Sequence, residues 1–534
     1  MHASRRTFLK QIGSSLALTS WAPAGMLWAD DKVPTSLATL PRSTPEAQGI
    51  SSAAIQAFLD GLAAAKHEMH GLVMVRRGHV IAEGWWAPYA PDLRHTLYSM
   101  SKSFTSTAVG FAVAEGRLKV TDKVVSFFPK DLPEQVSDNL AALTVKDLLT
   151  MSVGNEKEPT QTVVKSENWV RTFLAQTITH TPGTVFMYNS AATYMCSAIV
   201  QKLTGQPILQ YLTPRLFEPL GIQSPTWESC PLGINTGGWG LSVPTGALAK
   251  FGQLYLQKGQ WQGKQILPAA WIEEATSFKI QQPDPAKPSR PKEKNDWLQG
   301  YAYQFWRCQN GAYRGDGAFG QFTIVLPEQE TVIAINSETS GMQDQLDLVW
   351  EHLLPALKKD ATLPADAVAE GKLRSTLAGL NLPPLAGQSG AQPPADVSGK
   401  WFALETNGLG IEQVKFDLKT DSVVFTAKAG GKEHVIGCGQ GSWQKGETGM
   451  PGTPPRLISG GASPAGTPFK VAASAAWTKA NTLEMMWRYY ETPHHDSVTC
   501  EFEGSTVKVA FLNSLAKKQA NPKDSRGVLQ GKLA

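Results

Sequence analysis

The chain has 534 residues, and its 50 Lys and Arg residues almost balance its 46 Asp and Glu residues, which gives a formal net charge of +4. Its composition, with 42% hydrophobic and 18% charged residues, excludes a disordered chain, a collagen and a coiled coil. The small net charge and the lack of any long basic run argue against a nucleic-acid binder. No apolar stretch is as long as the roughly 18 residues that a membrane-spanning helix needs. A globular protein with about two to four folding units is therefore expected.

The first 29 residues have the features of an export signal. Arg5 and Arg6 precede Phe8-Leu9-Lys10 and a short apolar stretch at 12–21, and small residues suited to cleavage follow up to Ala29. A positive start, an apolar middle and a small-residue end are typical of secretory signals. The arginine pair resembles the twin-arginine (Tat) motif, which implies a bacterial protein that the Tat machinery exports, already folded, to the periplasm. No membrane span is expected after cleavage of residues 1–29.

Residues 40–357 have the patterns of one α/β (α+β) unit. Ser51 and Ser52 cap a predicted helix at 53–66, and Arg77-Gly78 joins two predicted strands. In chain order, strands are predicted at 71–76 and 79–86, helices at 99–115, 145–150, 169–176, 191–203, 208–216, 246–258 and 269–277, strands at 302–307, 322–326 and 332–336, and a last helix at 344–357. Strands at both ends of a helical middle predict one sheet that is built from distant segments and carries a helical insert.

A linker and a small all-β domain are predicted after this unit. Residues 358–395 are rich in Ala, Pro, Leu and Gly, which is typical of a linker or a strap on the surface. Residues 396–534 contain short alternating runs, at 400–405, 414–418, 422–427, 434–438, 472–477, 482–490, 497–503 and 506–512. Regular short strands predict a sandwich or a barrel. Two roles are hypothesised for this β domain: a lid over the active site, or a dimer contact.

A serine and a lysine lie one helical turn apart at the start of the helix that begins at residue 99. Ser99 and Lys102, in the run Ser99-Met100-Ser101-Lys102, are at positions i and i+3 and so share one helix face. A serine hydroxyl is a weak nucleophile, and a lysine can serve as its base when burial lowers the pKa of the amine. The dipole and free N–H groups of a helix N-terminus favour negative charge that develops there. This pair is a candidate catalytic centre, although S-x-x-K alone is common by chance.

Two further segments carry candidate site residues. Tyr188 stands on a loop that follows Thr181-Pro182-Gly183 and precedes a predicted helix, so its side chain can project into a cleft; a core tyrosine is the alternative. Residues 315–320 match G-x-G-x-x-G, but they lead into a strand and not into a helix, which speaks against dinucleotide binding. Glycines beside a strand fit the close approach of a ligand.

Together these segments resemble the family of serine β-lactamases, penicillin-binding proteins and related esterases, nearest to the class C type. The resemblance covers about residues 40–357 and rests on Ser99-Met100-Ser101-Lys102, Tyr188 and the glycine-rich turn before a strand. The connecting segments agree in order and spacing, among them Asp147-Leu148-Leu149-Thr150-Met151, Leu216-Phe217-Glu218-Pro219-Leu220-Gly221 and Gly237-Gly238-Trp239-Gly240-Leu241. The resemblance implies a β-lactamase/transpeptidase-like sheet flanked by helices.

The resemblance also implies a role for each site residue. Ser99 would be the acylated nucleophile, Lys102 its base or proton relay, and Tyr188, from the Y-x-N motif, the proton shuttle to the leaving group. Gly315-Asp316-Gly317 matches the K-T-G motif, so that Ala318, next to Gly317, supplies one oxyanion N–H and Ser99 the other. The reaction would need no metal and no cofactor.

Several positions depart from the family pattern. Ser190 stands where the Y-x-N motif has its asparagine, and the K-T-G motif has lost its lysine and threonine. Arg314 lies next to that motif and could partly substitute for the lysine, but a neighbour in the chain need not point the same way. Trp239, in its glycine-rich setting, could line the cleft or pack in the core. Without a cation for a substrate carboxylate, small esters, or amides that need no carboxylate, become the expected substrates.

We therefore expect an exported serine hydrolase that cleaves a small ester or amide through an acyl-enzyme on Ser99. One alternative is a β-lactamase or D,D-peptidase that acts on β-lactams or peptidoglycan peptides. The other is a catalytically inert protein that binds cell-envelope material.

Other motifs in the sequence are weaker evidence for a functional site. His67-Glu68-Met69-His70 falls one residue short of the zinc motif H-E-x-x-H, and His494-His495 is predicted to lie in a solvated loop. No G-x-S-x-G elbow occurs, which argues against an α/β-hydrolase. The five cysteines are too few for a disulfide framework; one bridge is possible, but its pairing is open.

Overall fold

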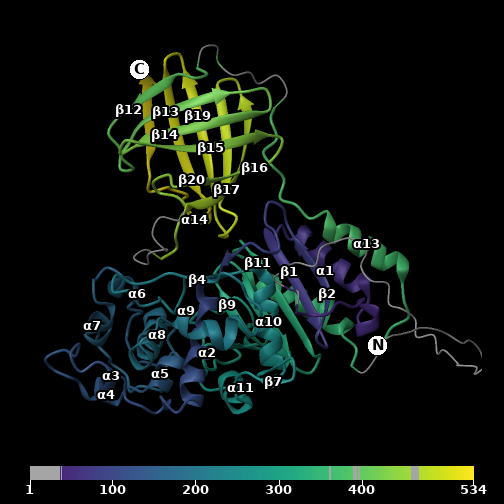
Figure 1. Cartoon of the computed structure of the whole chain (residues 1–534), viewed down its shortest axis with the longest axis vertical. Coiled ribbons are helices and arrows are strands. Elements are labelled where there is room, and N and C mark those ends of the chain that lie inside the picture. Colours follow the sequence, from purple (N-terminus) through teal and green to yellow (C-terminus); the bar gives the residue numbers. More distant parts are fainter. Residues whose placement is uncertain (1–36, 38, 360–361, 389–393, 395–396, 459–467) are drawn as a thin grey trace, which may run out of the picture. The chain divides into compact units, whose positions relative to one another are not determined.

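The computed structural model of the chain describes residue 37 and residues 39–534, except for 360–361, 389–393, 395–396 and 459–467 (Figure 1). The predicted export signal at 1–29 lies outside the described residues. Among the residues that the structure describes, no helix is both long and apolar enough to cross a membrane.

A six-stranded antiparallel sheet forms the centre of the first domain. Its strand order is β2-β1-β11-β10-β9-β8. The strands are β1 (Met69–Arg76), β2 (His79–Trp85), β8 (Trp306–Arg307), β9 (Tyr313–Gly317), β10 (Gln321–Leu326) and β11 (Thr331–Ser337). The first two strands come from the N-terminal end of the domain and the other four from its C-terminal end, which confirms the prediction of one sheet built from distant segments.

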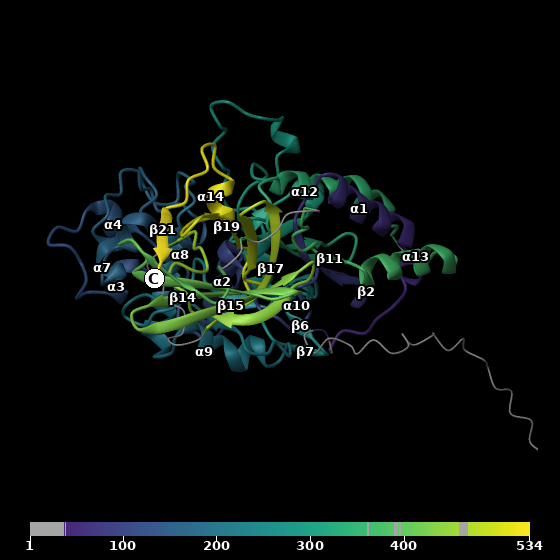
Figure 2. The ribbon, with the colours of Figure 1, turned by 90° about the horizontal axis from the view of Figure 1, so that it is seen from above.

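Helices cover both faces of this sheet. Helix α1 (Ser52–Ala64) starts as predicted, because the Ser51 side chain caps it by accepting a hydrogen bond from the Ala54 N–H. Helix α1 contacts α12 (Met342–Leu348), and the two lie together on one side of the sheet (Figure 2). Helix α10 (Thr245–Leu256) packs against β1, β10 and β11 and is buried almost throughout. Strands β1, β10 and β11 are buried along their whole length, as expected for central strands covered on both faces.

The helical insert surrounds α2 (Ser101–Ala114), which is buried over nearly all its length and contacts α8 and strand β9. The other helices of this domain are α3 (Val124–Phe127), α4 (Asp138–Ala142), α5 (Val145–Leu149), α6 (Thr160–Val163), α7 (Trp169–Leu174), α8 (Ser190–Thr204), α9 (Ile208–Leu212) and α11 (Ala269–Thr276). Two small sheets complete the domain: β3 (His95–Thr96), β4 (Thr226–Trp227) and β5 (Leu241–Val243) form one, and β6 (Gln260–Trp261) and β7 (Lys264–Gln265) form the other. The predicted helices at 145–150, 169–176, 191–203 and 246–258 are confirmed within a few residues.

Three local predictions differ from the structure. The predicted strand at 302–307 shrinks to β8, and the glycine-rich run at 315–317, expected as a turn, belongs to strand β9. The predicted linker at 358–395 contains helix α13 (Ala367–Ala378), which contacts α1 and β2. Leu373 of this helix is buried against the apolar core on that side of the sheet, and this tertiary contact outweighs the linker-like composition.

The C-terminal domain is a ten-stranded sheet that closes into a β-barrel, one of the two architectures that the sequence predicted (Figure 1). Its strands are β12 (Trp401–Leu404), β13 (Ile411–Leu418), β14 (Ser422–Ala429), β15 (Lys432–Gln440), β16 (Gln444–Thr448), β17 (Phe469–Lys479), β18 (Thr482–Arg488), β19 (His495–Glu503), β20 (Thr506–Asn513) and β21 (Val528–Leu533). A short helix, α14 (Ser514–Lys517), connects β20 to β21. A parallel pairing of β15 with β17 closes the ring of antiparallel neighbours. The barrel has its own apolar core, with Phe425, Trp487 and Phe502 among its members.

Candidate active site

The candidate nucleophile Ser99 lies in a tight turn at the start of helix α2. Residues Tyr98–Met100 form a single 3-10 turn that runs into α2, so Ser99 stands at the N-terminal end of that helix. Strand β9 passes directly behind this turn. A Cβ atom on Gly315 would overlap Met100, and one on Gly317 would overlap the carbonyl oxygen of Leu97. The two glycines are therefore needed so that β9 can lie against the turn that carries Ser99.

Lys102 is fixed by three hydrogen bonds in the interior of the site. Its Nζ donates to Ser99 Oγ at 3.0 Å, to Ser190 Oγ at 3.0 Å and to the carbonyl oxygen of Gly238 at 2.7 Å. The side chain is almost fully buried. Burial lowers the pKa of Lys102 to about 7, although the negative charges of Glu158 and Asp316 act in the opposite direction. Lys102 can therefore be a neutral amine near neutral pH and accept the proton of Ser99.

Tyr188 completes the group at Ser99, as predicted from its loop position. Its ring lies 4.8 Å from Lys102 Nζ and stacks on Trp306 with the ring centroids 5.6 Å apart. Burial raises the pKa of Tyr188, and its hydrogen bond with Ser99 only partly offsets that effect. Tyr188 therefore stays protonated at neutral pH and can donate its hydroxyl proton during the reaction.

Residues 189 and 190 have separate functions at the start of helix α8. Asn189 is buried; its side chain accepts a hydrogen bond from the Ala192 N–H and donates one to Asn155 Oδ1, so it caps the helix. Ser190 directs its hydroxyl to Lys102, and its N–H donates to Glu158 Oε1 at 3.1 Å. The residue predicted to contact substrate thus also helps to hold the base.

The candidate oxyanion donor Ala318 stands at the tip of the hairpin between β9 and β10. It follows Gly317, which lies against the turn of Leu97 to Met100, so the hairpin tip is next to Ser99. The hairpin continues through Phe319 and Gly320, both with positive φ, to Gln321, which pairs with Gly317. The oxyanion role of the Ala318 and Ser99 N–H groups stays a prediction, and this position of the hairpin tip is consistent with it.

Arg314 does not take the place of the missing K-T-G lysine, a substitution that the sequence had left open. Its Nε donates to Asp316 Oδ2 at 2.8 Å, one Nη donates to the carbonyl oxygen of Asp296 and to Cys308 Sγ, and its guanidinium lies over the ring of Trp297. The side chain is fully buried. Side chains alternate along a strand, so Arg314 and Asp316 share one face of β9, opposite the glycines that meet the Ser99 turn.

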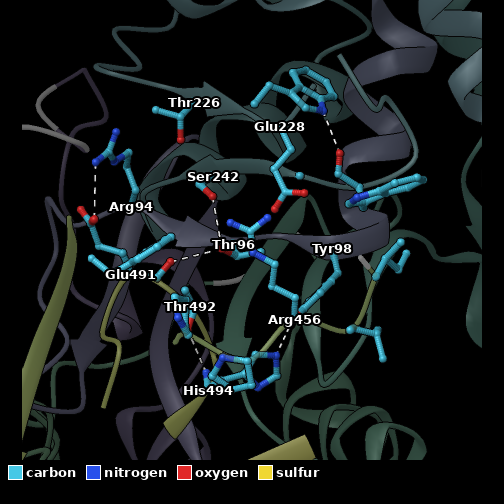
Figure 3. A pocket seen from close by; sticks show the side chains of 18 of the residues that line it. Arg94, Thr96, Tyr98, Thr226, Glu228, Ser242, Arg456, Glu491, Thr492 and His494 are labelled. Carbon is cyan, nitrogen blue, oxygen red and sulfur yellow. Dashed lines mark hydrogen bonds and ion pairs between the residues drawn. The ribbon is translucent and has the colours of Figure 1, made fainter. Parts of the chain in front are cut away.

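Trp239 is buried, with its ring stacked on Trp169 at 5.7 Å between centroids. Part of it also lines a cavity beside the site, whose wall includes Tyr98, Glu228 and residues of the barrel (Figure 3). The labelled side chains that line this cavity are Arg94, Thr96, Tyr98, Thr226, Glu228, Ser242, Arg456, Glu491, Thr492 and His494. Contact between Trp239 and substrate stays a prediction.

Two contributors to the site have no motif that could have indicated them. The Gly238 carbonyl oxygen bonds Lys102, but a backbone acceptor leaves no side-chain pattern to find; only the glycine pair at 237–238 marked the segment. The negative charge of Glu158 acts to raise the pKa of Lys102, and this residue lies on a loop that no motif indicated.

Residues from two of the weaker motifs, 67–70 and 494–495, lie close together in the structure. His494 and His495 are buried, so the prediction of a solvated loop is wrong. Ligand atoms of Glu68, Glu338 and His495 all lie within 4.8 Å of one another, but Arg488 Nη1 binds Glu68 at 2.6 Å and Lys518 Nζ lies 3.3 Å from Glu338. Protein cations thus already neutralise these carboxylates. All five cysteines are buried and free, so no bridge forms.

The fold and this arrangement of serine, lysine and tyrosine define a serine hydrolase. The beta-lactamase family model matches residues 52–356, more than half of the chain, and the chain belongs to this family. It is 28% identical over 318 residues to the 6-aminohexanoate-dimer hydrolase of Paenarthrobacter ureafaciens, covering 55% of this chain and 78% of that protein. It is 27% identical over 145 residues to a beta-lactamase of Escherichia coli, covering 26% and 37% of the two chains. The octameric penicillin-binding protein homologue from Pyrococcus abyssi superposes with a TM-score of 0.45 at 17% identity, over 81% of this chain and 97% of that one.

The lowered pKa of Lys102 predicts how activity depends on pH. Only the neutral amine can take the proton of Ser99. The value of kcat/KM for an ester should therefore rise with pH through a midpoint near 7 and reach a plateau at higher pH. Glu158→Gln removes a negative charge that favours the ammonium form, so this variant should shift the midpoint to lower pH.

The exposed neighbour Glu156 provides the matched control, since Glu156→Gln should leave the midpoint in place. The measurement is a pH profile of kcat/KM for p-nitrophenyl butyrate. An unchanged or higher midpoint in Glu158→Gln would contradict the role given to Lys102.

Proposed function

We propose that the protein hydrolyses small carboxylic esters, and more slowly amides, through an acyl-enzyme on Ser99. The observation that carries this proposal is the charge around the base. Gly315 stands where the family has the K-T-G lysine, so no cation at that position offsets the negative charge of Glu158, which acts on Lys102. Asp316, the second carboxylate that acts on Lys102, is paired with Arg314. A substrate carboxylate would meet repulsion here, whereas an uncharged ester would not.

In the proposed mechanism, Lys102 takes the proton of the Ser99 hydroxyl while Ser99 Oγ attacks the substrate carbonyl. The N–H groups of Ser99 and Ala318 stabilise the negative oxygen of the tetrahedral intermediate. Tyr188 donates a proton to the leaving alkoxide or amine as the bond to it breaks, and the proton held by Lys102 restores the tyrosine hydroxyl. Water then hydrolyses the acyl-enzyme in the same sequence and releases the acid.

The relatives support a hydrolase of broader range than the β-lactamases. The relative with the longest match reported above is a 6-aminohexanoate-dimer hydrolase, an enzyme named for hydrolysis of an amino-acid dimer. Departures at Gly315 and Ser190 from the β-lactamase motifs point in the same direction. A linear amide is therefore the second substrate class to test.

A comparison of substrates tests the proposal. Steady-state kcat/KM would be measured for p-nitrophenyl butyrate, the 6-aminohexanoate dimer, nitrocefin and a D-Ala-D-Ala peptide. We expect the ester, the one uncharged substrate of the four, to have the highest value, and the three substrates that carry a carboxylate to have lower values. Nitrocefin or peptide turnover far above ester turnover would instead support the β-lactamase or D,D-peptidase alternative.

We also propose that the protein is exported to the periplasm through the Tat pathway. The support is the pair Arg5-Arg6 followed by Phe8-Leu9-Lys10 and a short apolar stretch. In cells that carry a Tat pathway, Arg5→Lys combined with Arg6→Lys should leave the full-length chain in the cytoplasm, while the unchanged chain appears shortened in the periplasmic fraction. Equal distribution of both forms would contradict export by this route.

A further inference from the structure

The barrel contacts the residue that directly precedes the nucleophile. Tyr98 is buried, and its hydroxyl forms a short hydrogen bond with Nε2 of His494, the residue just before strand β19. Tyr98 has a φ of 48°, a left-handed conformation that non-glycine residues rarely adopt. Such a conformation persists when the surrounding structure holds it in place. The contact with His494 is therefore placed where it can fix the turn that carries Ser99.

The same histidine also contacts the residue that follows the oxyanion donor. Phe319, next to Ala318, has a φ of 70°. Its ring packs edge-on against Tyr98, with centroids 5.6 Å apart, and edge-on against His494, at 5.2 Å. Two strained non-glycine residues thus flank the two groups that meet the substrate carbonyl, and one imidazole touches both of them.

His494 is itself held in one orientation. Its Nδ1 lies 2.8 Å from Glu338 Oε1 and 3.1 Å from Ser514 Oγ. A carboxylate beside Nδ1 favours a proton on that nitrogen, and Nε2 is the atom that faces the Tyr98 hydroxyl. Glu338 directly follows sheet strand β11 and is buried. The imidazole is therefore fixed at one end by the central sheet and at the other by the nucleophile turn.

Other contacts attach the barrel to the first domain independently of His494. Arg488 of strand β18 binds the Glu68 carboxylate through two nitrogens, at 2.6 and 3.1 Å. The Thr96 N–H donates to the carbonyl oxygen of Glu491. Loss of the His494 contacts alone would leave these attachments in place, so the local effect of the histidine can be separated from docking in general.

We propose that His494 is a positioning residue that, through Tyr98 and Phe319, holds the Ser99 nucleophile and the Ala318 oxyanion donor in register, so that the barrel is part of the catalytic machinery. This inference rests on the proposed function of Ser99. Misplacement of reacting groups by about 1 Å can cost on the order of 10²-fold in rate. The effect falls on kcat, because His494 is argued to act on the geometry of the reaction and not on the affinity for substrate.

The test compares His494→Leu, His494→Gln and Tyr98→Phe in the full chain. We expect His494→Leu to lower kcat for p-nitrophenyl butyrate by about 10²-fold with little change in KM. His494→Gln keeps an acceptor near the position of Nε2 and should recover most of that loss. Tyr98→Phe should lower kcat as well, and the double variant should be no slower than His494→Leu, because both changes remove the same hydrogen bond.

Two controls on the barrel separate this role from a general effect. His434→Leu, on strand β15, should leave both kcat and the melting temperature unchanged. Arg488→Met removes a docking ion pair and should lower the melting temperature but affect kcat less than His494→Leu does. A folded His494→Leu variant with kcat within threefold of the unchanged protein would overturn the proposal. If that variant does not fold, Tyr98→Phe decides: wild-type kcat would likewise overturn the proposal, and a reduced kcat would support it.

Labelling of Ser99 distinguishes a failure of this inference from a failure of the proposed function. A fluorophosphonate should label the unchanged protein completely and the His494→Leu variant completely but more slowly. Lack of labelling in the unchanged protein would overturn the function and the inference together. Equal labelling rates in both would overturn the inference alone.

Discussion

Replacement of Ser99 by alanine is expected to abolish hydrolysis, with kcat falling by at least about 10⁴-fold. Loss of the nucleophile in a serine hydrolase costs on the order of 10⁶-fold, and what remains comes from binding and the oxyanion donors. Ser99 is partly exposed to solvent and is hydrogen-bonded to both the buried Lys102 and the partly buried Tyr188. The comparison of kcat for p-nitrophenyl butyrate between the two proteins measures the effect.

Intact-mass analysis after treatment with a fluorophosphonate provides the control. The unchanged protein should gain the mass of one adduct and Ser99→Ala should gain none. Ser103→Ala, one turn further along α2, is the matched variant and should still be labelled, because its hydroxyl donates to the Gln304 carbonyl oxygen and faces away from Lys102. An equal adduct on Ser99→Ala, or none on the unchanged protein, would favour the alternative of an inert envelope-binding protein.

The active-site residues could be predicted from the sequence where short-range geometry fixes them. The i, i+3 spacing places Ser99 and Lys102 on one helix face whatever the rest of the chain does, and the structure joins them at 3.0 Å. Tyr188 could be predicted for a similar reason, because it lies just before the start of a helix. The start of α1 at its Ser51 cap was predictable for the same reason.

Features that depend on long-range contacts could not be predicted in this way. Strands β16 and β21 were missed because their sequences, QKGET and VLQGKL, show no clear alternation of apolar and polar residues. Strand β21 also pairs with β12, which lies far away in the chain. The face of β9 to which Arg314 points depends on strand register, so sequence adjacency to the K-T-G position left its side open. His494 had the pattern of a surface loop, since its partners Tyr98 and Glu338 are 396 and 156 residues away in the chain.

The loss of Lys102 is predicted to have the second large effect. Lys102→Met should reduce kcat for p-nitrophenyl butyrate by about 10⁴-fold, the upper end of what a positioned base contributes. Methionine has a similar length and fills the buried space, so the change removes the amine without opening a cavity. Ser99 would then lose its proton acceptor, and Ser190 and the Gly238 carbonyl would lose a shared partner. The exposed Lys165→Met is the matched control and should keep full activity.

Lys102→Arg tests whether the amine acts as a base or only as a charge. Arginine keeps a positive charge and can still donate hydrogen bonds, but it does not deprotonate in the working range of pH. If Lys102 works as the neutral base, this variant should be as inactive as Lys102→Met at every pH from 6 to 9. Recovery of activity in Lys102→Arg would mean that the positive charge matters more than proton transfer. In that case the pH midpoint near 7 would have to come from another group, because an arginine side chain at position 102 stays charged and does not titrate near pH 7.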